Sequence, residues 1–310
     1  MKKNMNSVSD VVIAHGDVDG IVSAAEIIKA YGLKRETTKL VFTQPFLVDQ
    51  IPQEFIQQAQ RIFVVDIAVN NRDPEMTMKF IEKIWDKLTV WYDHHQGWSR
   101  IQGKLGSKFG KFIIETTNSC AELVAENEGL RSDFVRELVR DAIAADTRRG
   151  QLSEIGELID QAIKSDLGDD TIREAAVRWL AEGAPQDPEN KEYRKLLEAQ
   201  QKYREIKETT EHLINQYEIR HGIAVVDVTQ ENRDYDRTQL LIAGQKMAPT
   251  GISVVIGKNP EGEEIVTIAT NREDINLVAL FGLPSGAPFR ISLPTAEWPL
   301  ERVLEKLKNL

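Results

Sequence analysis

The sequence predicts an α/β protein with three parts. These are an N-terminal domain whose mostly parallel sheet is flanked by helices, a helical connector, and a smaller C-terminal α/β domain. The first observation behind this fold class is that short β-branched runs alternate with stretches of helical periodicity from Asp10 to about Ser119. Such alternation is typical of parallel strands joined by helices that cover both faces of the sheet. The second observation is that a similar alternation returns from residue 219 onward, after a long charged stretch.

The N-terminal domain begins with a predicted strand, a sharp turn and a helix. Asp10–His15 is a β-branched run that stops at Gly16, and Ile21–Tyr31 then shows helical periodicity that is closed by Gly32. Further apolar runs predict strands at Lys39–Val48, Arg61–Val69, Leu88–Tyr92 and Lys111–Glu115. Helices are predicted to begin at Asp73 and near Ser119.

A long helical region separates the two domains. Ser153–Gln216 has helical character throughout, except for a break at Gly183–Asn190 where turn-forming residues gather. Lys191–Tyr217 predicts one long charged helix that is suited to join two domains. We therefore place the N-terminal domain at residues 1–190, the helical connector at 191–218 and the C-terminal domain at 219–310.

The C-terminal domain is predicted to contain a second, smaller set of strands and helices. Its strands are expected at Ile223–Val228, Ile252–Gly257, Glu264–Ala269 and Phe289–Ser292. Its helices are expected at Arg237–Met247, Ile275–Phe281 and Leu300–Leu307. This domain carries no excess of Lys and Arg over Asp and Glu, which weakens a role in binding long nucleic acids.

Composition indicates a soluble protein, which we expect to be cytoplasmic and to have no membrane partner. The chain has 310 residues, of which 41% are hydrophobic and 28% are charged, and no apolar run approaches the ~20 residues that span a bilayer. A single cysteine, Cys120, excludes an internal disulfide framework. The net charge of −10 argues against a dedicated duplex-DNA binder. It does not exclude a phosphate substrate, because bound divalent cations can invert the local field.

Four acidic or histidine clusters carry the chemistry of the N-terminal domain. They are the motif His15-Gly16-Asp17-Val18-Asp19-Gly20, the lone Asp66, the triplet Asp93-His94-His95, and Asp146. Each cluster alone is compatible with a turn, a helix cap or a solvated surface. Together they follow successive elements of one α/β sheet, where ligands collect at the carboxyl ends of the strands.

The chemistry of these side chains indicates a metal site. Carboxylates that lie close together are costly unless a cation sits between them. Imidazole with carboxylate suits manganese and is also accessible to magnesium or zinc. Because one metal needs only three or four ligands, the larger set suggests two metals that share a bridging acid.

These motifs, in this order and spacing, resemble those of the DHH phosphoesterase superfamily over about residues 8–150. That superfamily includes RecJ-like exonucleases, nanoRNA and phosphoadenosine phosphatases, cyclic-dinucleotide phosphodiesterases and family II pyrophosphatases. The resemblance implies that His15, Asp17 and Asp66 hold one metal. It implies further that Asp66 bridges to a second metal, whose other ligands are Asp19, His94 and Asp146.

The same resemblance implies the remaining catalytic roles and the cofactor. Asp93 would orient a histidine ring, and His95 would face the substrate phosphate. Independently of the resemblance, Arg148 and Arg149 are placed beside Asp146 where they could meet a phosphate. The cofactor would be two Mn²⁺ ions, with Mg²⁺ as an alternative. The expected reaction is hydrolysis of phosphodiester or phosphomonoester bonds in nucleotides or short single-stranded oligonucleotides by a two-metal-activated water. The oligomeric state is left open, with a homodimer among the candidates.

The C-terminal domain resembles the DHH-associated substrate-binding domain but departs from it in one loop. The family carries a glycine-rich GGGH-type loop, whereas Phe281–Arg290 keeps Gly282 and Gly286 and has no histidine. Arg272 stands where the family has a phosphate-binding arginine, and a solvated turn arginine is the competing interpretation. Arg290 is a candidate to replace the lost histidine.

Several alternatives stay open at this stage. The altered loop leaves room for a pyrophosphatase or polyphosphatase, and a non-catalytic DHH-fold scaffold in DNA replication or repair is a further alternative. The stretch Gln96–Ile114 has basic residues, no acid, and the aromatics Trp98 and Phe109. It predicts either a mobile surface loop, which we favour, or a phosphate-backbone track with stacking aromatics.

Overall fold

The computed structural model describes residues 8–310 except 71–72, 148, 260–261, 284–288 and 309. The chain divides into two compact units, Met1–Gln201 and Lys202–Leu310. The division falls inside helix α9 (Lys191–Ile214), which therefore contributes residues to both units. In the part of the chain that is described, no helix combines the length and apolarity needed to cross a membrane.

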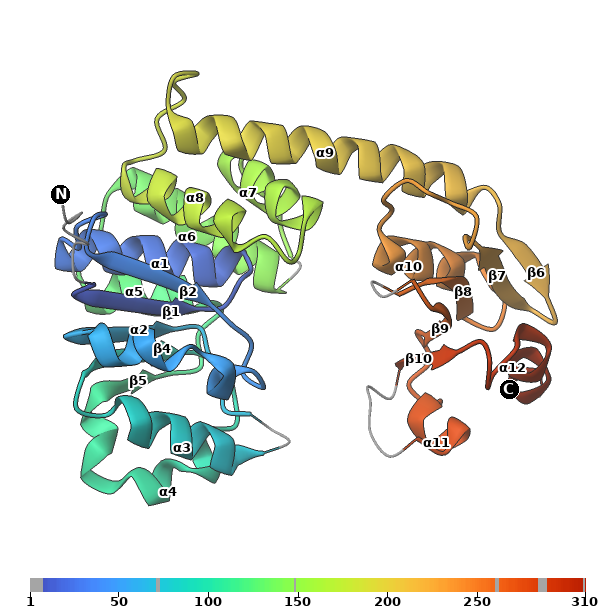
Figure 1. Cartoon of the computed structure of the whole chain (residues 1–310), viewed down its shortest axis with the longest axis horizontal. Coiled ribbons are helices and arrows are strands. Elements are labelled where there is room, and N and C mark those ends of the chain that lie inside the picture. Colours follow the sequence, from blue (N-terminus) through green and yellow to red (C-terminus); the bar gives the residue numbers. More distant parts are fainter. Residues whose placement is uncertain (1–7, 71–72, 148, 260–261, 284–288, 309) are drawn as a thin grey trace, which may run out of the picture. The chain divides into compact units, whose positions relative to one another are not determined.

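The N-terminal unit is built on a five-stranded sheet in which every neighbouring pair is parallel (Figure 1). The strand order is β2-β1-β3-β4-β5. The strands are β1 (Asp10–Ala14), β2 (Thr38–Phe42), β3 (Arg61–Val65), β4 (Leu88–Asp93) and β5 (Phe112–Ile114). The predicted mostly parallel sheet is thus confirmed, and the carboxyl ends of its strands share one edge.

Helices cover both faces of this sheet because its strands are apolar on both sides. In β1, Val12 and Ala14 belong to one core, whereas Val11 and Ile13 belong to the other. The first core is closed by α1 (Val18–Tyr31), α5 (Cys120–Asn127), α6 (Asp133–Thr147), α7 (Glu154–Ser165) and α8 (Asp170–Ala181). The second is closed by η1 (Val48–Gln50), α2 (Gln53–Gln58), α3 (Pro74–Ile84), η2 (Trp98–Arg100), α4 (Gln102–Leu105) and η3 (Gly106–Lys111).

Three sequence expectations for this unit are corrected. The run Lys39–Val48 is not one strand, because β2 ends at Phe42 and Pro45 cannot donate a ladder hydrogen bond. The helical region after Ser153 has a second break between α7 and α8. The stretch Gln96–Ile114 is not a loose surface loop. It forms short helical turns and contributes Trp98, which is buried in the second core.

The C-terminal unit has a second five-stranded sheet, of order β10-β9-β8-β7-β6, in which only β7 and β8 are parallel. Its strands are β6 (Glu218–Arg220), β7 (Ile223–Asp227), β8 (Ile252–Lys258), β9 (Glu264–Thr270) and β10 (Arg290–Pro294). Its helices are α10 (Arg237–Met247), α11 (Leu277–Phe281) and α12 (Leu300–Leu307). The expected small α/β unit is present, with β6 as a strand that the sequence did not predict.

Candidate metal centre

The turn between β1 and α1 gathers three acidic or imidazole side chains into a short stretch. Asp17 caps α1, and its Oδ1 accepts a hydrogen bond of 3.1 Å from the backbone of Gly20. A Cβ at Gly20 would lie 2.4 Å from the carbonyl oxygen of His15, so only glycine fits this turn. The turn therefore holds His15 and Asp17 at the carboxyl end of β1 and starts α1 at once with Asp19 on its first turn.

Asp66 follows β3 in a strained backbone conformation. Its φ of 57° lies in the left-handed region, which a non-glycine residue rarely adopts. Its N–H donates to the carbonyl of Tyr92 at 2.9 Å, so the turn is tied to the end of β4. The side chain is buried at 3% exposure. Strain of this kind persists where the surrounding structure requires one side-chain position, as at ligand sites.

Two histidines present one ring nitrogen each to the carboxylates and use the other for a hydrogen bond. His94 has Nδ1 3.2 Å from the carbonyl of Thr117, and His15 has Nε2 2.9 Å from Oε1 of Gln44. At His94 the carbonyl acceptor favours the proton on Nδ1 and leaves Nε2 as a lone pair, whereas both ring nitrogens of His15 face side-chain oxygens. Both rings are thus held with one nitrogen toward the carboxylates, which is the orientation of a metal-ligating histidine.

The two histidines face different oxygens of the same carboxylate. Nε2 of His94 lies 3.6 Å from Oδ1 of Asp66, and Nδ1 of His15 lies 3.7 Å from Oδ2 of Asp66. Around His94, Nε2 is also 3.5 Å from Asp19 and 3.6 Å from Asp146. His15 is 2.7 Å from Asp17. The described residues therefore form the groups His15–Asp17–Asp66 and Asp19–His94–Asp146, with Asp66 between them, and a third group of possible ligands, Asp66–His94–His95, overlaps both.

The donor set fits divalent cations. Oδ1 of Asp66 and Nε2 of His94 are buried, and neither has a hydrogen-bond partner among the described residues. Buried polar atoms without partners are costly unless something binds them. Burial, with Asp19 and Asp17 nearby, raises the pKa of Asp66 well above its usual value, and burial raises the pKa of Asp19 to about 7. A cation between these groups would remove the penalty of keeping them charged.

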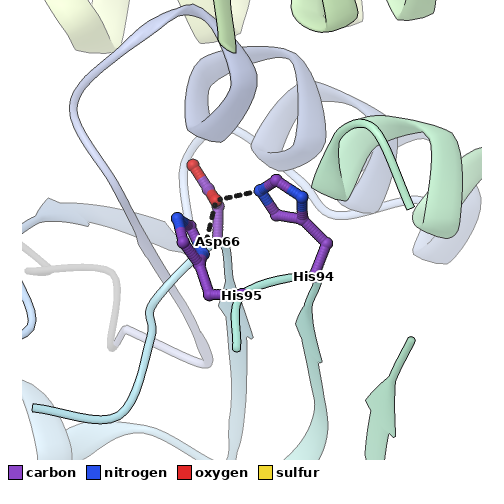
Figure 2. Close-up of side chains that lie close together, drawn as sticks. All are labelled: Asp66, His94 and His95. Carbon is purple, nitrogen blue, oxygen red and sulfur yellow. Dashed lines mark ion pairs between the residues drawn. The ribbon is translucent and has the colours of Figure 1, made fainter. Parts of the chain in front are cut away.

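Asp93, unlike the other acids, has both oxygens occupied by side-chain donors. Its Oδ1 lies 2.8 Å from Nδ1 of His95, and its Oδ2 accepts a 2.6 Å hydrogen bond from Nε1 of Trp98. The bond to Asp93 raises the pKa of His95. Figure 2 shows the rings of His94 and His95 on either side of the Asp66 carboxylate. Because Nδ1 of His95 is held by Asp93, its Nε2 is the nitrogen left for another partner.

The candidate substrate residues of the C-terminal unit have unequal surroundings. Arg272 is engaged by Asp274 and by the carbonyl of Leu310. Gly282 ends α11 in the left-handed conformation, so its position is explained by the helix end. Arg290 begins β10 and donates to Thr238 at 3.1 Å; partial burial and the nearby Arg237 lower its pKa. The remaining candidates, Arg148 and Gly286, lie outside the described residues.

Three residues that support the site were not predicted from the sequence. Gln44 follows β2 and could have been found by the strand-end rule that found the acids. Trp98 was seen only as a stacking aromatic, and its bond to Asp93 leaves no local signal. Arg173, on α8, donates from Nε to the carbonyl of Gly16 at 2.9 Å, across 157 positions of sequence.

Comparison with solved structures identifies the fold. PggH, a pGpG-specific phosphodiesterase from Vibrio cholerae, matches over 97% of this chain and 98% of its own, at 14% identity and a TM-score of 0.61. Exonuclease RecJ bound to manganese matches over 98% and 90%, at 11% identity and a TM-score of 0.60. The DHH domain of a member of the S1p family of ribosomal proteins matches over 99% and 88%, at 14% identity and a TM-score of 0.57. No protein-family model and no curated protein matches the sequence.

This chain has the DHH fold that its sequence motifs implied, and it carries acidic and histidine groups that could hold metal ions. Because the identities are low, these similarities establish the fold, and the chemistry must be argued from the chain's own residues.

Proposed function

We propose that this chain is a metal-dependent phosphoesterase that hydrolyses phosphodiester or phosphomonoester bonds of nucleotides or short oligonucleotides. The observation that carries the proposal is the buried Asp66 carboxylate, whose two oxygens face two separate ligand groups. Two divalent ions bridged by one acid are the arrangement that activates water for attack on phosphorus. The activities of the structural neighbours, a phosphodiesterase and an exonuclease, agree with this chemistry.

In this proposal His15, Asp17 and Asp66 hold one ion. Asp19, His94 and Asp146 hold the second together with Asp66. Manganese is the metal expected from the mixed nitrogen and oxygen donors, and magnesium is the alternative. When bound, the ions supply the activation of water and the neutralisation of charge on the phosphate.

The protein's own contribution is positioning. Gln44 and the Thr117 carbonyl fix the ring orientations of His15 and His94. Asp93 fixes His95 so that its Nε2 is free to meet a phosphoryl oxygen, and the ring is 41% exposed. In the reaction an O–P bond forms to water, the ester P–O bond breaks, and the leaving alcohol gains a proton.

The test is a metal-dependent activity screen with purified protein. We expect manganese to support turnover of at least one of bis-p-nitrophenyl phosphate, short oligoribonucleotides, phosphoadenosine phosphate and cyclic dinucleotides. Removing the metal with EDTA should abolish it, and added Mn²⁺ should restore it. No turnover of the whole panel in a protein that binds manganese would refute the proposal.

The same screen separates the alternatives. Phosphate release from pyrophosphate or polyphosphate at rates well above those on nucleotides would indicate a pyrophosphatase or polyphosphatase. Metal analysis that finds less than one manganese per chain, with no activity, would indicate a non-catalytic scaffold. The intact ligand set argues against the scaffold, since all six side chains of the two ligand groups are retained.

A further inference from the structure

A cavity of about 480 Å³ lies beside β2, the edge strand of the N-terminal sheet. This volume falls within the range of ~300–1,000 Å³ that is typical of small-molecule sites. Its walls come from β2 and the two residues after it, from the segment through η1 and α2, and from the start of α8. The lining residues that matter here are Gly16, Phe42, Gln44, Phe55 and Leu167.

One end of this cavity lies against the turn that carries the first ligand group of the candidate metal centre. Gly16 lies between His15 and Asp17 in the sequence, and Gln44 is 2.9 Å from the ring of His15. A ligand that fills the cavity would therefore lie beside His15 and Asp17, although neither of these side chains lines the cavity. Ligands of open α/β sheets bind outside the carboxyl ends of the strands, which is where this turn lies.

The backbone of the edge strand offers free hydrogen-bonding groups to this cavity. The N–H of Thr43 donates to the carbonyl of Ala14 on β1. Because the backbone groups of successive residues alternate in direction, those of Lys39 and Val41 also point toward β1. The N–H and C=O groups of Leu40 and Phe42 consequently point away from the sheet. Within the described residues, no hydrogen bond reaches them from outside the sheet. Adjacent donors and acceptors of this kind match the polar edge of a nucleobase.

Apolar and aromatic side chains flank these polar groups. Phe55 is half-buried on α2, and Leu167, just before α8, is 73% exposed despite its apolar side chain. Nζ of Lys39 lies 5.1 Å from the centre of the Phe55 ring, and a base could stack on the part of that ring which Lys39 leaves open, with Leu167 as a further apolar contact. The lining also includes four charged residues, Lys39, Asp170, Arg173 and Glu174, and small-molecule sites commonly combine apolar walls with such polar groups.

We propose that this cavity binds a nucleobase of the substrate, next to the phosphate held at the metal centre. The inference rests on the proposed function, because it takes a nucleotide as the substrate. Continuity with the His15 turn favours a nucleobase over an extended peptide added to the edge of β2. The cavity would thus make nucleotides better substrates than esters of the same phosphate without a base.

The first test measures binding rather than turnover. In the presence of Mn²⁺, wild type and the variants Phe55→Ala, Leu167→Ala and Phe46→Ala are titrated with adenosine 5′-monophosphate and with inorganic phosphate. Phe46 is 56% exposed and does not line the cavity, so its variant is the control. Phe55→Ala should weaken nucleotide binding on the order of tenfold, as expected for losing one stacking partner, and leave phosphate binding unchanged. Leu167→Ala should act in the same direction, by less, and at little risk to folding.

The outcomes separate this proposal from the proposed function. Equal effects of Phe55→Ala on nucleotide and phosphate, or no effect on either, would overturn the nucleobase site. If the protein hydrolyses no substrate, and Phe55→Ala still weakens nucleotide binding selectively, the nucleobase site is supported and the hydrolase function is refuted. In the presence of Mg²⁺, the nucleotide should also shift the backbone amide NMR signals of Leu40 and Phe42. If the nucleotide shifts neither amide signal, the nucleobase site is refuted. If only an extended peptide shifts them, the cavity binds a protein partner instead.

Discussion

The two sheets of this protein place polar residues in different ways. In the N-terminal unit all neighbouring strands are parallel, so residues that follow β1, β3 and β4 meet at one edge. His15, Asp66 and His94 come together there although 79 positions separate the first from the last. In the C-terminal unit most neighbours are antiparallel, so successive strand ends lie at opposite edges.

Because of this difference, sequence motifs predict a site more reliably in the N-terminal unit than in the C-terminal unit. In a parallel sheet, acids that follow different apolar strands lie at the same edge, so residues found by this simple pattern are close in space. In a mixed sheet they are not, so each candidate in the C-terminal unit must be judged by its own contacts. Arg272 is already engaged by Asp274, whereas Arg290 has only a hydroxyl partner among the described residues. We expect function to follow the same division, with larger effects at the N-terminal metal centre than in the C-terminal unit.

The largest effect is expected from Asp66→Asn. The substitution removes one of the two oxygens that face the two ligand groups, so both ions should be lost or misplaced. We expect activity to fall by on the order of a thousandfold or more, beyond the ~10–100-fold typical of residues that only support a ligand. Activity and manganese content should be measured together. The exposed Asp86→Asn is the control, and two tightly bound ions in the Asp66 variant would exclude the bridging role.

A smaller effect is expected from His95→Gln. Because Nδ1 of His95 is held by Asp93, we place the ring on the substrate phosphate rather than on a metal. Turnover should fall about a hundredfold, as when one transition-state donor is removed, with manganese content unchanged. His212→Gln, in the exposed part of α9, should change neither quantity. Loss of one manganese per chain would show instead that His95 is a ligand.

The sequence predicted these residues because their signals are local. A strand's apolar run and the acid or histidine that ends it lie within a few positions, and parallel topology does the rest. The same reasoning located the strands of both sheets apart from β6, whose three exposed residues carry no apolar pattern. The fold class therefore followed from periodicity alone, and the largest error at a strand end is at β2, which ends at Phe42 rather than Val48.

The supporting contacts could not be predicted, for a physical reason. The bond of Arg173 to the carbonyl of Gly16 joins α8 to the β1–α1 turn. The bond of Trp98 to Asp93 depends on a short helical turn that buries the indole. Each depends on tertiary packing, and neither residue has a periodic neighbourhood that would mark it. Sequence patterns therefore predict a group of ligands better than they predict a single residue that orients one of those ligands.

Trp98→Phe tests one of these supports. Phenylalanine keeps most of the buried ring but cannot donate to Asp93, so Asp93 should orient His95 less well. We expect turnover to fall about tenfold, the lower end for such supporting residues, with manganese content kept. The half-buried Trp85→Phe, at the C-terminal end of α3, is the matched control. Equal loss in both variants would mean that the effect comes from packing alone.

The smallest effects are expected from the arginines of the C-terminal unit, and they discriminate between its two candidates. Arg272 makes two bonds to Asp274 and one to the carbonyl of Leu310, so its guanidinium is largely satisfied within the protein. Arg290 makes a single bond to Thr238, and the nearby Arg237 adds repulsion that a bound anion would relieve. We therefore expect Arg290→Ala to raise the KM for a nucleotide substrate severalfold with kcat little changed, and Arg272→Ala to act more weakly. Arg302→Ala, an exposed change in the same unit, is the control for both. The reverse order, with Arg272→Ala the more damaging, would return the phosphate contact to the position that the family resemblance assigned to it.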